Sequence, residues 1–261
     1  MDKYQPGILY FDWWIQQLAF KPYVQKLAAY YYNRASERGA GVAINYKYDA
    51  FKLNSAVFDI ERGQMNAIRP RLWQSDTSVA RNSWGYTAGN DYKQPNEILC
   101  DLIDVVSKNG ALLLNIGPKA DGTIPDEDRH ILEEIGQWLA VNGEAIYDTT
   151  HWKIFGEGPT QVEEGAFTDV KREAFTGEDI RFTYKRGVLY AFVLKMPEDG
   201  VVRIQSLKAG RGSRFNTVVT GVEVLGFEEK PELHHGAGLP LTITTKTVRS
   251  PYPVCFKIAF A

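Results

Sequence analysis

The sequence predicts an α/β protein in two parts: alternating strands and helices, as in a parallel sheet, and then an all-β, sandwich-like domain. Three observations lead to this fold class. Strand-like apolar runs alternate with amphipathic helical segments through about residue 150. The run ALLLNIG at 111–117 is uninterrupted, which is typical of a parallel strand buried on both faces. After about residue 165 the chain has only short strand-like runs separated by Gly, Pro and charged residues.

The alternating part begins with GILYFD at 7–12, an apolar run that predicts a short buried strand. Apolar side chains at helical spacing then occupy 22–38, and Gly39 ends this helix. The next apolar runs, GVAINY at 41–46 and RLWQSD at 71–76, predict the second and third strands. The segment VFDIERGQ between them is expected to be a loop.

Two helices flank the fourth predicted strand. One begins near Pro95 and stops at Asn109, and the other runs from Pro125 to about Val141 with three acids in its first turn, where the helix dipole favours them. The first part therefore has about four strands and three helices. A closed (β/α)8 barrel needs about twice as many strands. These units are either about half of such a barrel or an open parallel sheet, and periodicity does not separate the two.

The second part shows no convincing helix, and its strand-like runs predict an all-β sandwich domain. The stretch GEGPTQVEEG at 156–165 is the best linker candidate. We therefore expect one domain at 1–160 and another at 166–261. The runs that predict the β domain are RFTYKRGVLYAFVL, VVRIQSL, GVEVLGF, LTITTKTV and VCFKIAF.

The composition excludes several classes of function. The chain has 30 basic and 32 acidic residues, interspersed, so neither nucleic acid nor a membrane is an expected partner. Its two cysteines, Cys100 and Cys255, are far apart and lie in apolar segments, which predicts buried thiols without a disulfide framework or a zinc site. No metal-ligand cluster, nucleotide-binding loop or Ser-His-Asp pattern is present, so no cofactor is expected.

Asp12 in the stretch ILYFDWW is an ionisable residue among large apolar side chains at the predicted end of the first strand. It either caps the following turn or is a catalytic carboxylate, because functional side chains of parallel α/β folds gather at the C-terminal ends of strands. Glycosidic bond hydrolysis usually needs two such carboxyl groups. Glu61 is a second candidate, although a Glu beside Arg62 also fits a surface ion pair.

Aromatic residues are concentrated around these candidate carboxylates, and each could be core material or a platform on which a sugar stacks. From pattern alone the sequence predicts an α/β enzyme-like domain with a β sandwich that acts on carbohydrates. The aromatic residues near the predicted strand ends are Tyr10, Trp13, Trp14, Tyr46, Tyr48, Trp73, Trp84 and Tyr86.

Four segments read together resemble the C-terminal part of the α-L-fucosidases of glycoside hydrolase family 29, over nearly all of the chain and in the right order. The resemblance implies a (β/α)8-like catalytic barrel followed by a C-terminal β-sandwich, with the first part of this chain as about the C-terminal half of the barrel. The segments are ILYFDWW, RLWQSDTSVARNSWGY, VSKNGALLLNIGPKADGTIPDEDRHILEEIGQWLAVNGEAIY and IRFTYKRGVLYAFVLKMP.

The resemblance also implies a retaining mechanism that releases α-L-fucose. The family's nucleophile is the Asp of a strand-end motif that reads YFD here, which makes Asp12 the candidate. The acid/base in many members is a Glu in a following loop, and Glu61 stands at that place. Some members have been argued to use a Glu directly after the tryptophan of the later segment. This chain has Gln74 there, which cannot usefully donate a proton, so the departure favours Glu61.

Sugar contacts are implied less directly. Trp84 of SWGY resembles a sugar-contacting aromatic, and Tyr10, Trp13 and Trp73 complete the expected aromatic wall. Where the family often has an Asn-Asp-Arg-like sequence with a sugar-binding Arg, this chain reads IN-YKY. Tyr46 or Lys47 is therefore expected to substitute for that Arg.

The resemblance leaves out the N-terminal half of the barrel, with the histidines and the tryptophan of the family's fucose pocket. We therefore expect a fragment whose partners are a fucosylated glycan and either the missing barrel portion or a homo-oligomer. MDKYQPG lacks the features of a signal peptide, but in a fragment this leaves cytoplasmic and secreted locations open. The alternatives to an active fucosidase are a non-catalytic sugar-binding or assembly module and an enzyme with another sugar specificity. Linkage preference is not readable from the sequence.

Overall fold

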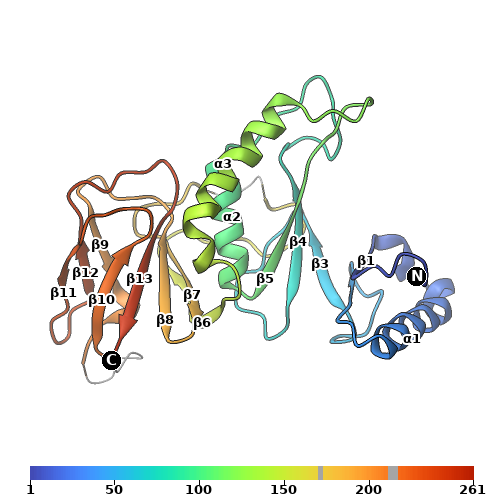
Figure 1. The fold of residues 1–261 in the computed structure, drawn as a ribbon, viewed down its shortest axis with the longest axis horizontal. Coiled ribbons are helices and arrows are strands. Elements are labelled where there is room, and N and C mark those ends of the chain that lie inside the picture. Colours follow the sequence, from blue (N-terminus) through green and yellow to red (C-terminus); the bar gives the residue numbers. More distant parts are fainter. Residues whose placement is uncertain (170–172, 211–216) are drawn as a thin grey trace.

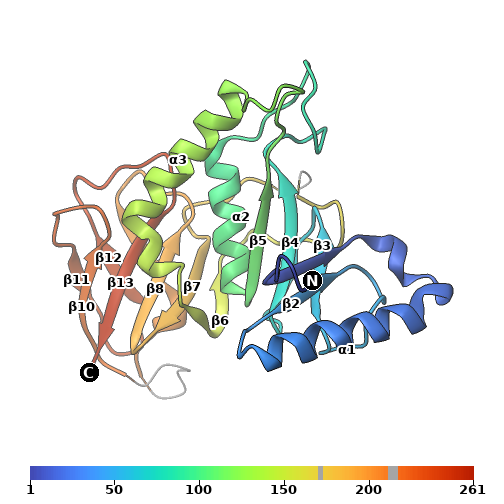
Figure 2. The same ribbon diagram turned by 45° about the vertical axis from the view of Figure 1, so that its right-hand side comes forward.

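A parallel sheet of five strands, in chain order, forms the first part of the protein (Figures 1 and 2). The computed structural model describes residues 1–169, 173–210 and 217–261. All four strand pairings of this sheet are parallel, as predicted. The strands are β1 (Ile8–Phe11), β2 (Ala43–Tyr46), β3 (Val57–Glu61), β4 (Trp73–Ser78) and β5 (Gly110–Asn115).

The strand β3 corrects the expectation of a loop at VFDIERGQ and makes five strands where about four were predicted. Its sequence, VFDIE, alternates apolar and acidic side chains, so it lacks the continuous apolar run by which a buried parallel strand is recognised. Glu61 is consequently the last residue of a strand and not part of a loop.

Three α-helices lie close to the predicted bounds: α1 (Lys21–Glu37) connects β1 to β2, α2 (Pro95–Ser107) connects β4 to β5, and α3 (Asp126–Asn142) follows β5 and leads to the second part of the protein. Short 3-10 helices lie at Trp13–Gln16, Leu18–Phe20 and Gly143–Ala145. The helices α2 and α3 lie between the parallel sheet and the rest of the molecule, whereas α1 runs alongside β1 and β2 (Figures 1 and 2). No helix in the described residues is long and apolar enough to span a membrane.

Two antiparallel sheets make up the second part, with orders β10-β13-β8-β7-β6 and β11-β12-β9. Buried side chains from both sheets, such as Phe182 and Ile243, form one hydrophobic core. The first of these strands, β6, comes from residues before most of the expected linker. The strands are β6 (Thr150–Glu157), β7 (Ile180–Lys185), β8 (Val188–Val193), β9 (Val201–Ile204), β10 (Val219–Val224), β11 (Glu232–His234), β12 (Leu241–Thr244) and β13 (Val254–Phe260).

The two faces of the parallel sheet differ in chemistry, because successive side chains of a strand point to opposite faces. On one face Phe58, Ile60 and Trp73 pack with the α2 residue Val105 in a hydrophobic cluster. The opposite face carries most of the polar side chains described below, and we call it the polar face. Leu113 of β5 lies on it and is 46% exposed, so β5 is not buried on both faces as its apolar run predicted.

A buried group of ionic side chains joins α2 to the antiparallel sheet. Asp104 of α2 accepts hydrogen bonds from Lys108 Nζ and from Arg181 Nε of β7. All three side chains are almost fully buried. Burial raises the pKa of Asp104, but the two cations outweigh it and hold the pKa below its usual value.

Replacing Asp104 by Asn should destabilise the protein by about 3 kcal/mol, because two buried cations lose their anionic partner. The measurement is the free energy of unfolding in urea. The matched control is Asp126→Asn, which removes an exposed partner of Arg129 and should change little. Equal losses for the two variants would contradict a joining role for Asp104.

Candidate active site

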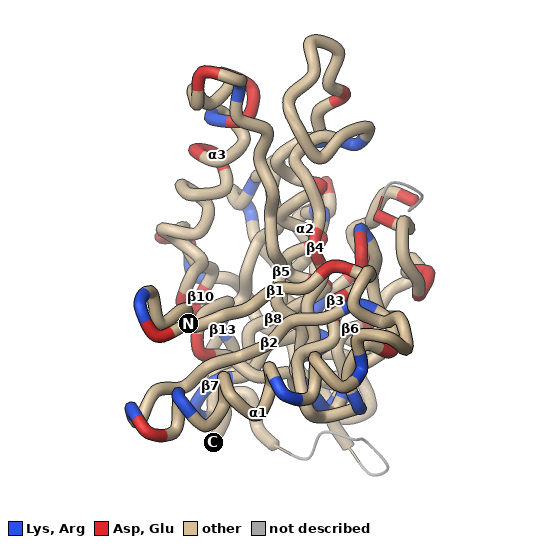
Figure 3. The backbone as a smooth tube through the Cα atoms, turned by 90° about the vertical axis from the view of Figure 1, so that its right-hand side faces the viewer, with Lys and Arg blue, Asp and Glu red and all other residues tan. Residues whose placement is uncertain are grey.

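Ionisable side chains from four adjacent strands meet on the polar face near the C-terminal ends of the strands. Figure 3 marks the acidic and basic positions along the backbone, seen from the side of the parallel sheet. The ionisable side chains gather at the strand ends because parallel strands end at the same edge of their sheet, and the register sets Glu61 beside Asp76 and Tyr10 beside Asn45. The members of this group, which we call the carboxylate cluster, are Tyr10 of β1, Lys47 directly after β2, Asp59 and Glu61 of β3, and Asp76 of β4.

Lys47 lies at the centre of the carboxylate cluster. Its Nζ is 2.9 Å from Asp76 Oδ2, 3.3 Å from Asp59 Oδ2 and 3.3 Å from Glu61 Oε2. The Lys47 side chain is 3% exposed, while that of Glu61 is 20% exposed. Of this ion pair, a solute can therefore reach Glu61 but not Lys47.

Neutral groups complete the contacts of the buried acids. The Tyr10 hydroxyl lies 3.0 Å from Asp76 Oδ2 and 3.3 Å from Asp59 Oδ2. Gln74 donates to Asp59 Oδ1 at 2.7 Å and accepts from Asn45 Nδ2 at 2.8 Å. The Gln74 amide thus orients the Asp59 carboxylate and does not itself act as an acid.

The burial and charge of the cluster change its proton affinities. Burial, followed by the charge of Asp76, raises the pKa of Asp59 to about 6. Burial lowers the pKa of Lys47, but the hydrogen bond and the charges of its three acidic neighbours reverse this and raise it overall. Burial and the charges of Asp59 and Asp76 raise the pKa of Tyr10. Lys47 and Tyr10 therefore stay protonated, while Asp59 titrates near neutral pH.

Asp12 follows β1 directly and is exposed. Its Oδ1 accepts a hydrogen bond of 2.8 Å from Trp13 N and caps the 3-10 helix Trp13–Gln16, as the strand-end interpretation predicted. Trp13 is 38% exposed and stacks on Trp14 at 4.2 Å between ring centroids. A capped, exposed carboxylate beside an aromatic pair remains accessible to a ligand, so capping and binding are compatible.

Arg62, which directly follows Glu61, holds the loop that carries Trp84. Its guanidinium lies 4.6 Å from the centroid of the Trp84 ring and donates to the carbonyls of Ala80, Arg81 and Ser83. Asn115 of β5 also donates to the Trp84 carbonyl, at 2.5 Å. Trp84 is 36% exposed, so one ring face can still meet a ligand while the other rests on Arg62.

The backbone at the end of β3 is fixed from a distant part of the chain. Phe167 N donates to the carbonyl of Glu61, and Thr168 N and Asp169 N donate to that of Arg62. Arg62 has φ +44°, in the left-handed region that non-glycine residues seldom adopt. A Cβ on Gly63 would lie 2.0 Å from the Gly165 carbonyl oxygen, so glycine is required there. These contacts determine where Glu61 points.

The structure does not bring two of the predicted sugar-binding aromatics to the polar face. Tyr46 is buried against Phe51 and Phe58, and Trp73 is buried with its indole N–H donating to the Lys108 carbonyl. Both belong to the opposite face, because they alternate with Asn45 and Gln74 along their strands. Alternation within β2 and β4 was the sequence signal that could have assigned them to the core.

Several site residues were missed by sequence reasoning. Neither Asp59 nor Asp76 is among the candidate site residues that the sequence predicts, yet both contact Lys47. The alternation of VFDIE, which places Asp59 and Glu61 on the same face, was the available signal for Asp59. Asn115 carried no such signal.

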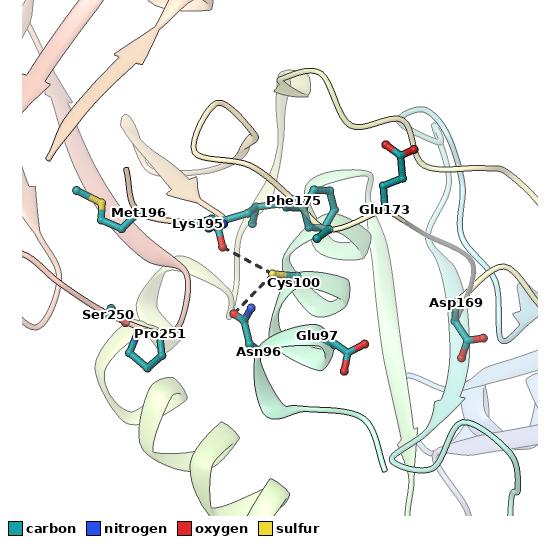
Figure 4. Close-up of a pocket in the computed structure, with 12 residues that line it drawn as sticks. Asn96, Glu97, Cys100, Asp169, Glu173, Phe175, Lys195, Met196, Ser250 and Pro251 are labelled. Atoms are coloured by element: carbon teal, nitrogen blue, oxygen red, sulfur yellow. Dashed lines mark hydrogen bonds between the residues drawn. The ribbon is translucent and has the colours of Figure 1, made fainter. Parts of the chain in front are cut away.

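A separate pocket of about 550 Å³ lies between the first turn of α2 and the antiparallel sheet (Figure 4). Cys100 Sγ faces Asn96 and the carbonyl of Leu194 there, each at 3.9 Å. Burial of both cysteines agrees with the sequence prediction. None of the predicted site residues lines this pocket. In the described ranges, no group of His, Cys, Asp and Glu side chains is arranged to hold a metal ion.

Carboxylates at the C-terminal edge of a parallel sheet, beside exposed aromatic rings, are typical of hydrolases that act on carbohydrates. The sequence model of a family described as "Alpha-L-fucosidase" matches residues 1–144. This match covers more than half of the chain, and the chain belongs to the alpha-L-fucosidase family.

Individual relatives agree with this family. Tissue alpha-L-fucosidase of Rattus norvegicus is 35% identical over 172 residues, or 65% of this chain and 32% of that protein. Plasma alpha-L-fucosidase of Homo sapiens is 31% identical over 204 residues, or 76% and 39%. The structure of Thermotoga maritima alpha-fucosidase in complex with fucose matches with a TM-score of 0.70 and 26% identity, covering 98% of this chain and 53% of that one. The chain thus spans about a third of these curated relatives and about half of the solved one.

Replacing Asp59 by Asn should make stability less dependent on pH between about 4 and 6. The raised pKa means that the folded protein holds this proton more tightly than the unfolded chain. The stabilising contribution of Asp59 is therefore present below about pH 4 and lost as pH rises through about 6, whereas Asn has no such loss. Urea unfolding at several pH values measures it. The control is Asp49→Asn, a change of an exposed acid, which should retain the wild-type pH dependence of stability. The same wild-type pH dependence in Asp59→Asn would contradict a raised pKa of Asp59.

Replacing Arg62 by Lys should loosen the loop that carries Trp84, because an ammonium cannot hold three carbonyls and a ring at once. Amide hydrogen exchange across residues 79–86 should become faster by on the order of tenfold. Arg69→Lys is the matched control, since Arg69 pairs with Glu164 away from this loop. Unchanged exchange in Arg62→Lys would contradict the role of the guanidinium.

Proposed function

We propose that this chain carries the nucleophile and the acid/base of a retaining α-L-fucosidase, with Asp12 and Glu61 in these roles. The observation that supports this most is that both acids lie at the C-terminal ends of strands of one parallel sheet, Asp12 directly after β1 and Glu61 as the last residue of β3, in a chain of the alpha-L-fucosidase family. Both are also accessible, unlike Asp59 and Asp76. The substrate is a terminal α-L-fucose on a glycan or oligosaccharide.

The reaction proceeds in two displacements. An oxygen of Asp12 attacks the anomeric carbon while the bond to the leaving oxygen breaks, and Glu61 gives that oxygen its proton. Glu61 then takes a proton from water, whose oxygen attacks the same carbon and releases the Asp12 carboxylate. The two carboxyl groups need to approach to about 5 Å for this chemistry. The Trp13 N–H stabilises the charge on Asp12 between turnovers.

Exposed rings beside the two acids supply the sugar contacts in this proposal. Tyr10, Trp13 and Trp84 keep accessible surface around the polar face. Stacking on such rings orients a sugar without requiring a charge. Tyr46 and Trp73 have no part in it, because they are buried in the core.

The parallel sheet corresponds, in this proposal, to about the C-terminal half of a (β/α)8-like barrel, and the antiparallel sheets to a β-sandwich domain. Two features support the barrel assignment: β1 and β5 are edge strands, and the match covers nearly all of this chain but about half of the solved relative. The partner that completes the barrel is the remaining part of the catalytic domain, or a second copy of the chain.

A sugar-binding module without turnover is the second candidate function. The ion pair between Lys47 and Glu61 favours it, because an ionised Glu61 has no proton to give. This candidate predicts fucose binding without hydrolysis. Turnover of an aryl fucoside separates the two.

Replacing Asp12 by Asn should abolish hydrolysis of 4-nitrophenyl α-L-fucoside, since the amide is a poor nucleophile. The assay uses the chain with the rest of the catalytic domain supplied, in frame or as a second polypeptide. Azide should restore turnover to Asp12→Gly and yield a fucosyl azide. Asp49→Asn, a change of another exposed acid, serves as the control and should stay active.

Normal turnover by Asp12→Asn would exclude Asp12 as the nucleophile. Fucose binding by the wild-type protein with no turnover would support the sugar-binding module instead.

A further inference from the structure

We propose that Lys47 is a positioning residue that holds the Glu61 carboxylate by its Oε2 and remains paired with Asp59 and Asp76 whenever Glu61 takes up a proton. This inference rests on the proposed acid/base role of Glu61. It replaces the expectation that Lys47 contacts the sugar.

Three acids surround the ammonium group of Lys47: Asp76 accepts its hydrogen bond, and Asp59 and Glu61 lie at ion-pair distance. An ammonium has three N–H groups, and three carboxylate oxygens lie between 2.9 and 3.3 Å from Nζ. The side chain is 3% exposed, so a sugar hydroxyl could reach it only by displacing an acid. Its effect on a reaction must therefore pass through those acids.

Glu61 differs from the two other partners of Lys47 in what holds it. Asp59 is also bound by Gln74 and Tyr10, and Asp76 by Tyr10 and by Arg62 N at 3.2 Å. Glu61 is the partly exposed member of the three. When Glu61 gains or loses a proton, the side chains of Asp59 and Asp76 therefore stay in place, whereas the Glu61 side chain can change its partner.

The charges around Lys47 explain why two further acids are needed. If Glu61 were its sole partner, each protonation of Glu61 would leave a buried ammonium unpaired, at a large cost in free energy. Asp59 and Asp76 remove this cost.

Other titratable or charged groups face this cluster from the neighbouring elements. Tyr10 of β1 contacts both aspartates and is neutral. The negative charge of Asp12 contributes to raising the pKa of Tyr10. The guanidinium of Arg62 pairs with Asp169 on the other side of β3 and is therefore committed elsewhere. Among the residues that the structure describes, Lys47 is thus the cation that pairs with Glu61.

The test is a pH titration of the chain labelled with ¹³C at its carboxyl carbons, with the Glu61 signal assigned from Glu61→Gln. Changing Lys47 to Met should raise the titration midpoint of Glu61 by about one pH unit or more, because the nearest positive charge is lost. The matched control, Lys52→Met, removes an exposed lysine outside the cluster and should leave the midpoint unchanged. An unchanged midpoint in folded Lys47→Met overturns the proposal.

A second variant covers the case in which Lys47→Met does not fold. Asp59→Asn keeps the oxygen that accepts from Gln74 and removes one negative charge, so the Glu61 midpoint should fall. A midpoint that stays the same or rises overturns the proposal.

These titrations need no turnover, so they fail independently of the fucosidase assignment. If Lys47 instead contacted the sugar, Lys47→Met would weaken fucose binding and leave the Glu61 midpoint in place. Failure of azide rescue at position 12 with a shifted Glu61 midpoint would reject the proposed reaction while keeping the charge pairing.

Discussion

The alternation of side chains across the parallel sheet is the constraint on which the rest of this structure depends. Each strand sends every second residue toward the helices and the others to the polar face. The helix side therefore collects Ile44, Tyr46, Ile60 and Trp73, while Asn45, Asp59, Glu61 and Asp76 collect opposite them. Acids on adjacent strands lie close only because the parallel register aligns them. A shift by one residue in β3 would bury Glu61 among the helices and expose Ile60.

The sequence predicts the alternating architecture well, because helices and apolar strands have strong periodic signals. Residues 21–37, 95–107 and 126–142 form helices close to their predicted bounds. It fails at β3, whose two acids lie on the polar face and interrupt the apolar run that marks a buried strand. It also fails to distinguish the buried Trp73 from the exposed Trp84, because residue type alone does not tell whether an aromatic ring lies in the core or at the surface. Resemblance to a family supplied Asp12 and Glu61, which pattern alone left as two acids among several.

Contacts between strands could not be predicted, because they depend on lateral register. Lys47 meets Asp76 across 29 positions of sequence and Arg62 meets Asp169 across 107. No local pattern encodes either distance. The same lysine that a motif comparison offers as a substitute for a sugar-binding arginine is surrounded by acids once the sheet forms. Its chemistry follows from its neighbours in space, and the polar face has an excess of acid that only a folded structure reveals.

The stretch that leads from the parallel sheet to β7 bears on how this protein can be recombined. Residues 167–169 donate to the carbonyls of Glu61 and Arg62, Gly165 N donates to that of Gln64, and Gly63 leaves room for the carbonyl of Gly165. Residues 165–169 therefore support the polar face, in addition to connecting the two parts of the chain. Because these residues follow β6 and precede β7, a chimera that takes its whole β domain from a relative also takes a foreign support for Glu61. An exchange of the β domain therefore changes the active site as well, unless residues 165–169 of this chain are kept.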